Sequence, residues 1–165
     1  MTAAVTIPAP RYPAKIATPD EALERIGRLP RPLVFTNGVF DVLHRGHVTC
    51  LEQARGLGAA LVVAVNSDDS VRRLAKAPKR PLNALADRMA VLAGLAAVDL
   101  VVSFDDDTPR ELIVACLPDL LVKGGDYSAA TTAGAAEVIA AGGRFVAIPF
   151  ATTHSTSQLI AKIRG

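Results

Sequence analysis

The sequence feature that most restricts the fold is a regular alternation of short apolar runs with amphipathic stretches. The runs are rich in Val, Leu and Ile without polar alternation, which is typical of strands covered on both faces. They are Leu33–Phe40, Ala60–Val65, Leu100–Phe104, Leu120–Val122 and Phe145–Phe150. The stretches with helical periodicity are His44–Leu57, Ala84–Leu95, Pro109–Leu117, Thr132–Ala141 and Ser155–Ile163. This alternation predicts an α/β fold with a doubly wound, five-stranded parallel sheet, whose strand C-termini form one ligand-binding edge.

The first 32 residues do not share this pattern. Prolines among small residues predict an extended, poorly ordered arm over residues 1–17. Thr18 is expected to cap a short helix, with Pro19 at its first position and Glu21 three residues further on. We therefore expect an arm with a short helix over residues 1–32 and one domain over residues 33–165.

Composition limits the classes of function. The chain has 165 residues and a net charge of +2, with 4% aromatic residues and no Trp. A protein whose main partner is a nucleic acid needs more basic charge or more stacking surface, so we expect no such partner. No apolar run approaches the ~20 residues of a membrane span, and no secretory signal opens the chain. The two cysteines, Cys50 and Cys116, suit a reduced, cytoplasmic setting.

The strongest chemical signal lies at the first strand-to-helix junction, where His44 and His47 would share one face of the first helical turn. Three interpretations compete: ordinary residues of a helix start, a metal site completed by Asp41 or Cys50, or two imidazole donors to phosphate beside the N–H groups of the helix. The other signals at this edge favour the third, and we predict no metal ligands. The preceding strand end is expected to bind the same ligand through the backbone around Thr36, Asn37, Gly38, Val39 and Phe40.

A basic cluster follows the second predicted strand and Asn66, the residue after it. Five of the nine residues from Arg72 to Arg80 are basic, and Ala77-Pro78 indicates a loop. A solvated basic face is the alternative interpretation. Because the loop would leave the sheet at the same edge as the histidines, we expect it to fold over a triphosphate. Its basic residues are Arg72, Arg73, Lys76, Lys79 and Arg80.

A glycine pair follows the fourth predicted strand. Lys123 and Asp126 flank this pair, and with Gly124 they are candidates to hold a polar substrate. The carboxylate could take sugar hydroxyls. A plain turn explains the glycines equally well.

Three more polar segments have roles that spacing leaves open. Ser155, Thr156 and Ser157 open the last predicted helix, either as ordinary N-caps or as a second cradle for an anion. Arg88 lies on another predicted helix and either reaches the site or forms a surface ion pair. Residues 105–107 are three consecutive aspartates before a helix start, and we expect them to complement the helix dipole rather than to bind metal.

Together these residues resemble the nucleotidyltransferases that carry a His-x-Gly-His motif and a Ser/Thr-rich start of the last helix. A narrower likeness, from Leu33 to Arg164, is to the heptose 1-phosphate adenylyltransferases of lipopolysaccharide core synthesis. The order Lys123-Gly124-Gly125-Asp126-Tyr127 narrows it to this sugar branch. The other matching segments are Val65-Asn66-Ser67-Asp68, Arg80-Pro81-Leu82-Asn83, Asp87-Arg88-Met89, Val98-Asp99, Phe104 with Thr108-Pro109, Pro118-Asp119-Leu120-Leu121-Val122 and Ser155-Thr156-Ser157.

The resemblance implies a Rossmann-like nucleotidyltransferase fold and a reaction. An adenylyl group would pass from ATP to D-glycero-β-D-manno-heptose 1-phosphate, with Mg²⁺, giving ADP-heptose and pyrophosphate. Many members fuse this domain to a sugar kinase. Because 32 residues precede the first strand, the resemblance here implies the stand-alone form, with a separate heptose kinase acting upstream. It also implies a possible homodimer. The alternatives are a cytidylyltransferase for glycerol 3-phosphate or a similar phosphorylated alcohol, and a non-catalytic nucleotide-binding sensor.

The resemblance also implies roles for the candidate residues. His44 and His47 would donate to the triphosphate, and Lys76, Lys79 or Arg80 would close over it, with Lys79 placed among the catalytic residues. Mg²⁺ would be held mainly by phosphate oxygens and water. The residues expected to bind nucleotide or sugar phosphate are Thr36, Asn37, Gly38, Val39, Phe40, Asn66, Lys76, Arg80, Arg88, Lys123, Gly124, Asp126, Ser155, Thr156 and Ser157.

Overall fold

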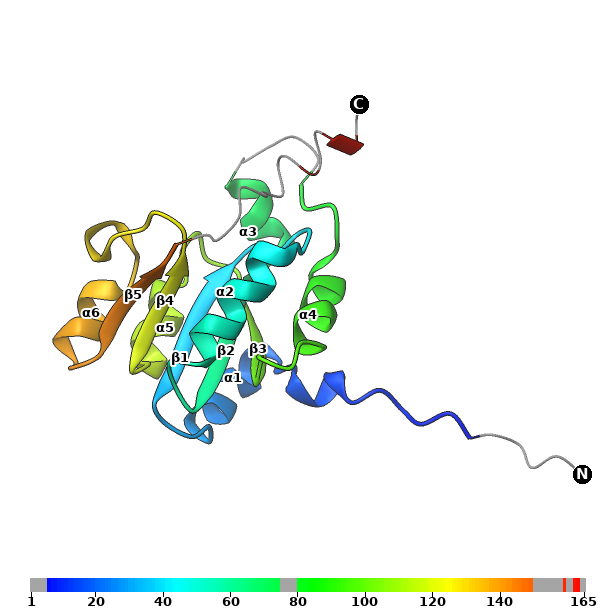
Figure 1. Ribbon diagram of the computed structural model, residues 1–165, viewed down its shortest axis with the longest axis horizontal. Coiled ribbons are helices and arrows are strands. Elements are labelled where there is room, and N and C mark those ends of the chain that lie inside the picture. The colour runs from blue at the N-terminus through cyan, green and yellow to red at the C-terminus, as the bar shows by residue number, and fades with distance from the viewer. Residues whose placement is uncertain (1–5, 75–79, 150–158, 160–161, 164–165) are drawn as a thin grey trace, which may run out of the picture.

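The sheet has five strands, all parallel, in the order β3-β2-β1-β4-β5 (Figure 1). The structure is a computed structural model that describes residues 6–74, 80–149, 159 and 162–163. The strands are β1 (Leu33–Gly38), β2 (Ala60–Asn66), β3 (Leu100–Phe104), β4 (Leu120–Gly124) and β5 (Arg144–Ile148). The predicted doubly wound α/β fold is therefore confirmed, with each predicted strand within a few residues of its observed bounds.

Helices cover both faces of the sheet (Figure 1). Alternate residues of each strand enter one of two apolar clusters, so that Phe35 packs with Ile113 on one face and Val34 with Leu51 on the other. The first face carries α1 (Pro19–Gly27), α5 (Arg110–Cys116) and α6 (Ala135–Ala140), and the second carries α2 (Arg45–Arg55) and α4 (Leu85–Ala93). The core is thus two apolar layers separated by the sheet.

One helix lies where the sequence predicts a loop. Helix α3 (Asp68–Arg73) follows β2 directly, and the Ser67 hydroxyl caps it by accepting from the Ser70 N–H at 3.0 Å. Arg72 and Arg73 therefore belong to a helix, and the loop interpretation is wrong for them. Residues 75–79 lie outside the described part of the chain, as does most of the helix predicted over residues 155–163.

The N-terminal segment is attached to the sheet. A 3-10 helix, η1 (Tyr12–Lys15), leads to Ile16, which forms a parallel bridge with Val101, and the Ala17 N–H donates to the Val101 carbonyl at 3.0 Å. The expectation of a poorly ordered arm is therefore wrong for residues 12–17. The predicted helix start at Thr18 is confirmed, because the Thr18 N–H donates to the Glu21 carboxylate at 3.1 Å.

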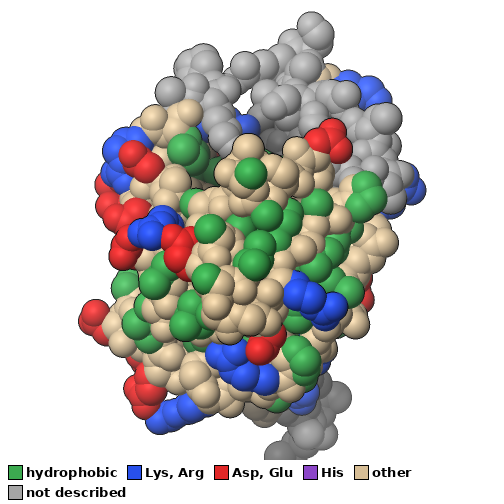
Figure 2. All heavy atoms as spheres, turned by 90° about the vertical axis from the view of Figure 1, so that its left-hand side faces the viewer, with side chains coloured by type: hydrophobic (Ala, Val, Ile, Leu, Met, Phe, Trp, Pro, Cys, Tyr) green, Lys and Arg blue, Asp and Glu red, His purple; other side chains and the backbone are tan. Residues whose placement is uncertain are grey.

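Strand β5 and helix α6 form one side of the molecule. Figure 2 shows that apolar side chains gather in the middle of this side, with charged side chains mainly around them. Helix α6 contributes Ile139, which is 48% exposed. A second 3-10 helix, η2 (Ala129–Thr131), precedes α6. Within the described ranges, no helix combines the length and the apolar character that crossing a membrane would require.

Candidate active site

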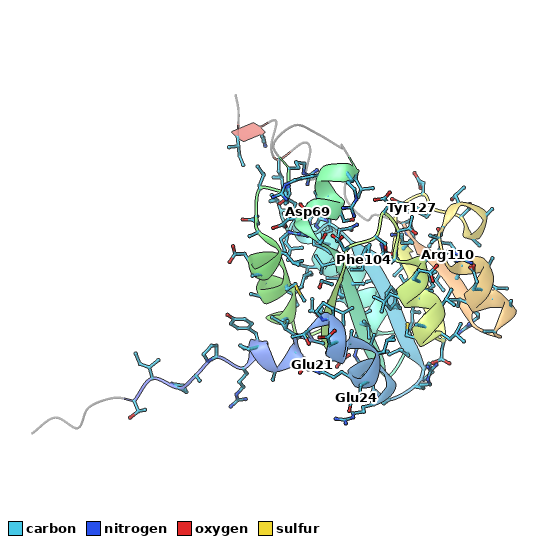
Figure 3. The ribbon with its side chains drawn as sticks, turned by 180° about the vertical axis from the view of Figure 1, so that it is seen from behind. Glu21, Glu24, Asp69, Phe104, Arg110 and Tyr127 are labelled. Carbon is cyan, nitrogen blue, oxygen red and sulfur yellow. The ribbon has the colours of Figure 1, made fainter. Side chains whose placement is uncertain are left out.

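A cavity of about 350 Å³ lies at the C-terminal edge of the sheet, lined by the ends of β1, β2 and β4. Because β1 stands between β2 and β4, the direction of winding reverses here, and open α/β sheets bind ligands at such a point. Asp69 on α3 and Tyr127 after β4 lie at this edge, on either side of Phe104 (Figure 3). Of the predicted site residues, the cavity brings together Thr36, Asn37, Gly38, Val39, Phe40, His47, Asn66, Lys123 and Gly124.

The two histidines cap helix α2 with their own rings. His44 is the N-cap residue, and its Nδ1 accepts from the Gly46 N–H at 3.1 Å. His47 Nδ1 accepts in turn from the His44 N–H at 3.4 Å. A ring nitrogen that accepts carries no hydrogen, so each neutral imidazole holds its proton on Nε2. The helix start thus fixes both rings as Nε2–H donors.

The environment of His47 keeps its ring neutral. Burial, and then the nearby His44, lower the pKa of His47 to about 4. The two ring centroids are 4.0 Å apart, and the Phe40 ring meets His47 edge-on at 5.5 Å. His47 lines the cavity, whereas His44 is not among the described lining residues. His47 therefore offers a neutral hydrogen-bond donor at neutral pH rather than positive charge.

A second polar group lines the opposite half of the cavity. By the alternation of the strands, Asn37, Asn66 and Lys123 point to the α5 face of the sheet, away from α2. Lys123 Nζ donates to Asn37 Oδ1 at 3.0 Å and to its carbonyl at 3.2 Å, and lies 5.2 Å from the centre of the Tyr127 ring. Asn66 Nδ2 donates to Ser70 Oγ at 3.0 Å. The cavity therefore has an imidazole half and an ammonium half.

Arg88 is buried behind the cavity and does not line it. Its side chain has no solvent exposure, and Nη1 donates to the Val39 carbonyl at 2.7 Å. Its Nε donates to the Asn83 carbonyl, and Nη2 donates to the Asn66 carbonyl and the Asp68 carboxylate. A surface ion pair is therefore the wrong description. Arg88 instead joins the ends of β1 and β2 to the start of α4.

Arg80 and Asp41 form a buried ion pair at 3.0 Å. The Asp41 carboxylate also accepts the backbone N–H groups of Leu82 and Asn83. Burial on its own would raise the pKa of Asp41, but these bonds and Arg80 outweigh it, so the pKa lies below its usual range. Arg80 thus points to Asp41 and is not among the described cavity-lining residues, and neither is the exposed Asp126.

The acidic residues before α5 pair with α3. Arg73 donates to the Asp107 carboxylate at 2.9 Å and to the Asp105 carbonyl, while Ser67 donates to the Asp105 carboxylate. Pro109 is the N-cap of α5 without a side-chain cap bond, so the expected effect of these aspartates on the dipole of α5 stays a prediction. Arg72 pairs with Asp69. Both arginines thus have carboxylate partners.

The described residues do not support a metal site at the histidines. Within these ranges no three His, Cys, Asp or Glu side chains are placed to hold an ion. Asp41 is bonded to residues 80–83, and burial, opposed by nearby Lys123, raises the pKa of the Cys50 thiol. The remaining predicted site residues lie outside the described part of the chain: Lys76, Lys79, Ser155, Thr156 and Ser157.

The cavity is also lined by residues that the sequence analysis did not select for the site. For Cys50 and Leu51 a signal existed, because they stand three and four residues after His47 and so share its helix face. The others belong mainly to loops, whose paths periodicity does not define. The unselected lining residues are Cys50, Leu51, Leu74, Asp107, Thr108, Pro109, Tyr127, Thr131, Thr132 and Ala133.

A parallel sheet with a switch-point cavity and paired imidazole donors at the start of α2 defines a nucleotidyltransferase of the α/β class. The family model described as cytidylyltransferase-like matches residues 35–160, most of the sheet and the whole cavity edge. The chain therefore belongs to the cytidylyltransferase-like family.

Two relatives of similar sequence indicate a narrower group within this family. A D-beta-D-heptose 1-phosphate adenylyltransferase of Bordetella bronchiseptica is 59% identical over 156 residues, covering 93% of this chain and 96% of the relative. The bifunctional protein HldE of Vibrio cholerae is 53% identical over 145 residues, which are 88% of this chain but 30% of HldE. This chain thus corresponds to one part of the bifunctional protein.

Solved structures share the fold. A lipopolysaccharide core biosynthesis protein from Thermoplasma volcanium has a TM-score of 0.60 and 25% identity, covering 74% of this chain and 98% of that one. Pantothenate synthetase from Thermus thermophilus has a TM-score of 0.56 at 20% identity, covering 82% and 61%. The second likeness concerns the fold alone.

Proposed function

We propose that the chain transfers the adenylyl group of ATP to D-glycero-β-D-manno-heptose 1-phosphate. An oxygen of the sugar phosphate forms a bond to the α-phosphorus of ATP, and the bond from that phosphorus to the β-bridging oxygen breaks. Pyrophosphate leaves with the electron pair, and ADP-heptose is the other product. The observation that carries the proposal is the imidazole pair held as Nε2–H donors at the switch-point cavity. The likeness to the Bordetella adenylyltransferase supports the choice of substrates.

The chemical problem in this reaction is charge rather than proton transfer. A sugar phosphate is largely ionised at neutral pH and is already a nucleophile, so the mechanism needs no general base. The enzyme must instead bring two anions together and stabilise the oxygens that gain charge at the α-phosphorus and on the leaving pyrophosphate. Oriented N–H groups and cations are the means available to the chain.

The imidazole half suits the triphosphate. His47 lines the cavity at the start of α2, where the free N–H groups and dipole of the helix favour an anion. A neutral imidazole locked as the Nε2–H tautomer can donate to a phosphate oxygen without having to reorient. His44 holds His47 through its backbone N–H and is proposed as the second donor. Lys76, Lys79, Ser155, Thr156 and Ser157 are proposed as further phosphate ligands.

The ammonium half suits the sugar phosphate. Lys123 is held beside the Asn37 amide on the α5 face, and its charge can offset that of the attacking phosphate. The loop residues beyond it, including Thr132 and Tyr127, supply hydroxyls on the same side. The α-phosphorus would then lie between the two halves, near the end of β1. Asp126 is proposed as an outer contact of the sugar.

We assign Mg²⁺ to the substrate. Among the described lining residues the one carboxylate is Asp107, and it already accepts from Arg73. Phosphate oxygens and water would therefore supply most of its ligands, and the ion would offset triphosphate charge. We further propose that the reaction takes place in the cytoplasm and that a separate kinase supplies the heptose 1-phosphate. Residues 33–165 form the transferase domain in this proposal, with residues 1–32 as an addition to it.

A homodimer is part of the proposal, and one observation supports it. Strand β5 is a sheet edge in the described ranges, and apolar side chains gather beside it (Figure 2). Such an edge offers unpaired backbone groups and apolar area to a second copy.

The deciding experiment is pyrophosphate release with a panel of substrates. ATP, CTP, GTP and UTP are each tested with heptose 1-phosphate, with glycerol 3-phosphate and without acceptor. We expect release only for ATP with heptose 1-phosphate. Activity confined to CTP would reject adenylyl transfer in favour of the cytidylyltransferase alternative. Binding of ATP without release for any acceptor would favour the sensor.

A further inference from the structure

Phe40 has an unusual backbone conformation at the wall of the cavity. Its φ is +50°, in the left-handed region that side chains with a Cβ rarely occupy. Such a conformation persists only where the surroundings enforce it, and it concentrates at functional sites. Phe40 is not at a helix end, where this conformation is common. The question is therefore what holds it and what its ring does.

Both neighbours of Phe40 are fixed from behind the cavity wall. The Val39 carbonyl accepts from the buried Arg88 at 2.7 Å. The Asp41 carboxylate accepts from the backbone N–H groups of Leu82 and Asn83 at 2.8 and 2.9 Å. Two buried charged groups thus set the direction of the chain on each side of residue 40, and the left-handed turn between them follows.

The turn places the Phe40 ring against two parts of the site. Its edge-on contact with His47 has a centroid distance of 5.5 Å and an interplanar angle of 62°. It also covers Gly38, where an added Cβ would lie 3.1 Å from Phe40 Cε2. Phe40 lines both the main cavity and a smaller one of about 100 Å³ that Asp41 and Leu43 also line. Phe40 therefore borders both the cavity that His47 lines and a second space that water could enter.

We propose that Phe40 is the positioning residue of His47, whose imidazole it holds in one plane and shields from water on one side. This deepens the proposed function and rests on it for the part that His47 plays. Gly38 then has a different task from the one the sequence suggested: its missing side chain makes room for the Phe40 ring rather than for a ligand.

The test is Phe40→Leu, with two readouts. We expect kcat for pyrophosphate release to fall about 10- to 100-fold while KM for ATP changes about 3-fold or less, since the donor is misplaced and not removed. The imidazole of His47, followed by NMR without substrate, should titrate above its native pKa of about 4, toward the ordinary 6.5, because it gains water. His44, which also lowers this pKa, and the other titratable groups that line the cavity, Cys50, Asp107, Lys123 and Tyr127, are the same in the variant.

Phe145→Leu is the matched control, because this half-buried phenylalanine packs on the other face of the sheet. This variant should leave kcat, the KM for ATP and the pKa of His47 unchanged. An unchanged His47 titration in Phe40→Leu would overturn the proposal, whatever happens to kcat, and so would native kcat. If the native chain releases no pyrophosphate with any acceptor, the proposed function fails, while the titration still decides whether Phe40 holds His47.

Gly38→Ala gives a second route should Phe40→Leu not fold. Its new methyl group displaces the ring by a few tenths of an ångström, so the His47 pKa should again rise. Combined with Phe40→Leu it should add little further loss, because the shorter side chain no longer reaches the added methyl group. If the losses in kcat of the two substitutions were fully additive, Gly38 would act on the ligand and not through the Phe40 ring, and this part of the inference would be overturned.

Discussion

At the scale of single residues, the proton on each histidine is assigned by a helix cap. The two Nδ1 atoms accept hydrogen bonds from backbone N–H groups at 3.1 and 3.4 Å, so neither Nδ1 carries a proton. The proton of each neutral ring is therefore on Nε2, where the donor role needs it. A protonated His47 would turn its Nδ1 into a second donor facing the His44 N–H. The low pKa of His47 and the cap therefore favour the same neutral tautomer.

Removing one such donor should slow the chemical step. We expect His47→Ala to lower kcat by about 100- to 1,000-fold, with a smaller change in ATP affinity, because the bond strengthens as charge develops on the phosphate oxygens. Steady-state pyrophosphate release and ATP titration measure the two effects. Gln53→Ala, an exposed substitution on the same helix, should leave both unchanged. Turnover near the native rate in His47→Ala would remove this histidine from the mechanism.

Asp41 makes stability depend on acid pH. Its folded pKa is lowered, so its contribution is complete above the unfolded value of about 3.9 and is lost as pH falls through the folded pKa. Asp41→Asn leaves Arg80, whose side chain is 13% exposed, without its charge partner and should cost about 3 kcal/mol in the free energy of unfolding. That difference should be constant from about pH 5 to 7 and should shrink below about pH 4 in urea titrations. The exposed Asp20→Asn should show neither effect; a difference that grows in acid would contradict the ion pair.

At the scale of elements, Arg88 connects four segments. Its guanidinium bonds to the residue after β1, the last residue of β2, the first residue of α3 and Asn83, two residues before α4. The guanidinium spreads five N–H donors over a rigid planar fork, whereas an ammonium has three donors on a single nitrogen. The position of the cavity wall thus depends on a residue that does not touch the cavity.

Arg88→Lys tests this connection while keeping the charge. At least two buried carbonyls would lose their donors, and we expect the free energy of unfolding to fall by about 2–4 kcal/mol. Arg110→Lys is the control, since Arg110 pairs with Glu111 and Glu137 at an exposed position and such pairs contribute less than about 1 kcal/mol. Chemical denaturation of both variants gives the comparison. Equal, small losses would mean that Arg88 is not a structural connection.

The strands could be predicted and α3 could not, for physical reasons. Fully buried parallel strands leave continuous apolar runs, as Ala60–Asn66 does. Helix α3 has six residues rich in charge, and its stability comes from partners on another segment: Arg73 meets Asp107 only because β2 and β3 end side by side, with Asn66 opposite Phe104. No local pattern contains that pairing, so the sequence alone predicts phosphate contacts for Arg72 and Arg73.

At the scale of the whole molecule, the sequence predicts which edge of the sheet holds the site. It does not predict which residues at that edge line the cavity and which lie behind its wall. His47 and Lys123 line the cavity, while Arg80 and Arg88, which the sequence also makes candidates for the site, lie behind its wall. The difference depends on buried acceptors such as Asp41 and the Val39 carbonyl, which are hidden until the elements are packed. Arg80 and Arg88 stabilise the wall through these acceptors, whereas Lys123, bonded to Asn37, lines the cavity itself.

The N-terminal segment provides the last test, because its two parts differ in attachment. Residues 6–11 are exposed, whereas Ile16 bridges Val101, and Lys15 donates to the Leu95 carbonyl at 3.0 Å. Ala17 adds a backbone bond and is buried, with 1% exposure. A chain that begins at Tyr12 should keep its free energy of unfolding within about 0.5 kcal/mol, while one that begins at Thr18 should lose about 2–4 kcal/mol, given net values near 1 kcal/mol for each lost bond plus apolar burial. Urea denaturation of both truncations measures this. Equal stability of the two would mean that residues 12–17 lie on the sheet without supporting it, whereas a loss already complete in the first would assign the support to the residues before Tyr12.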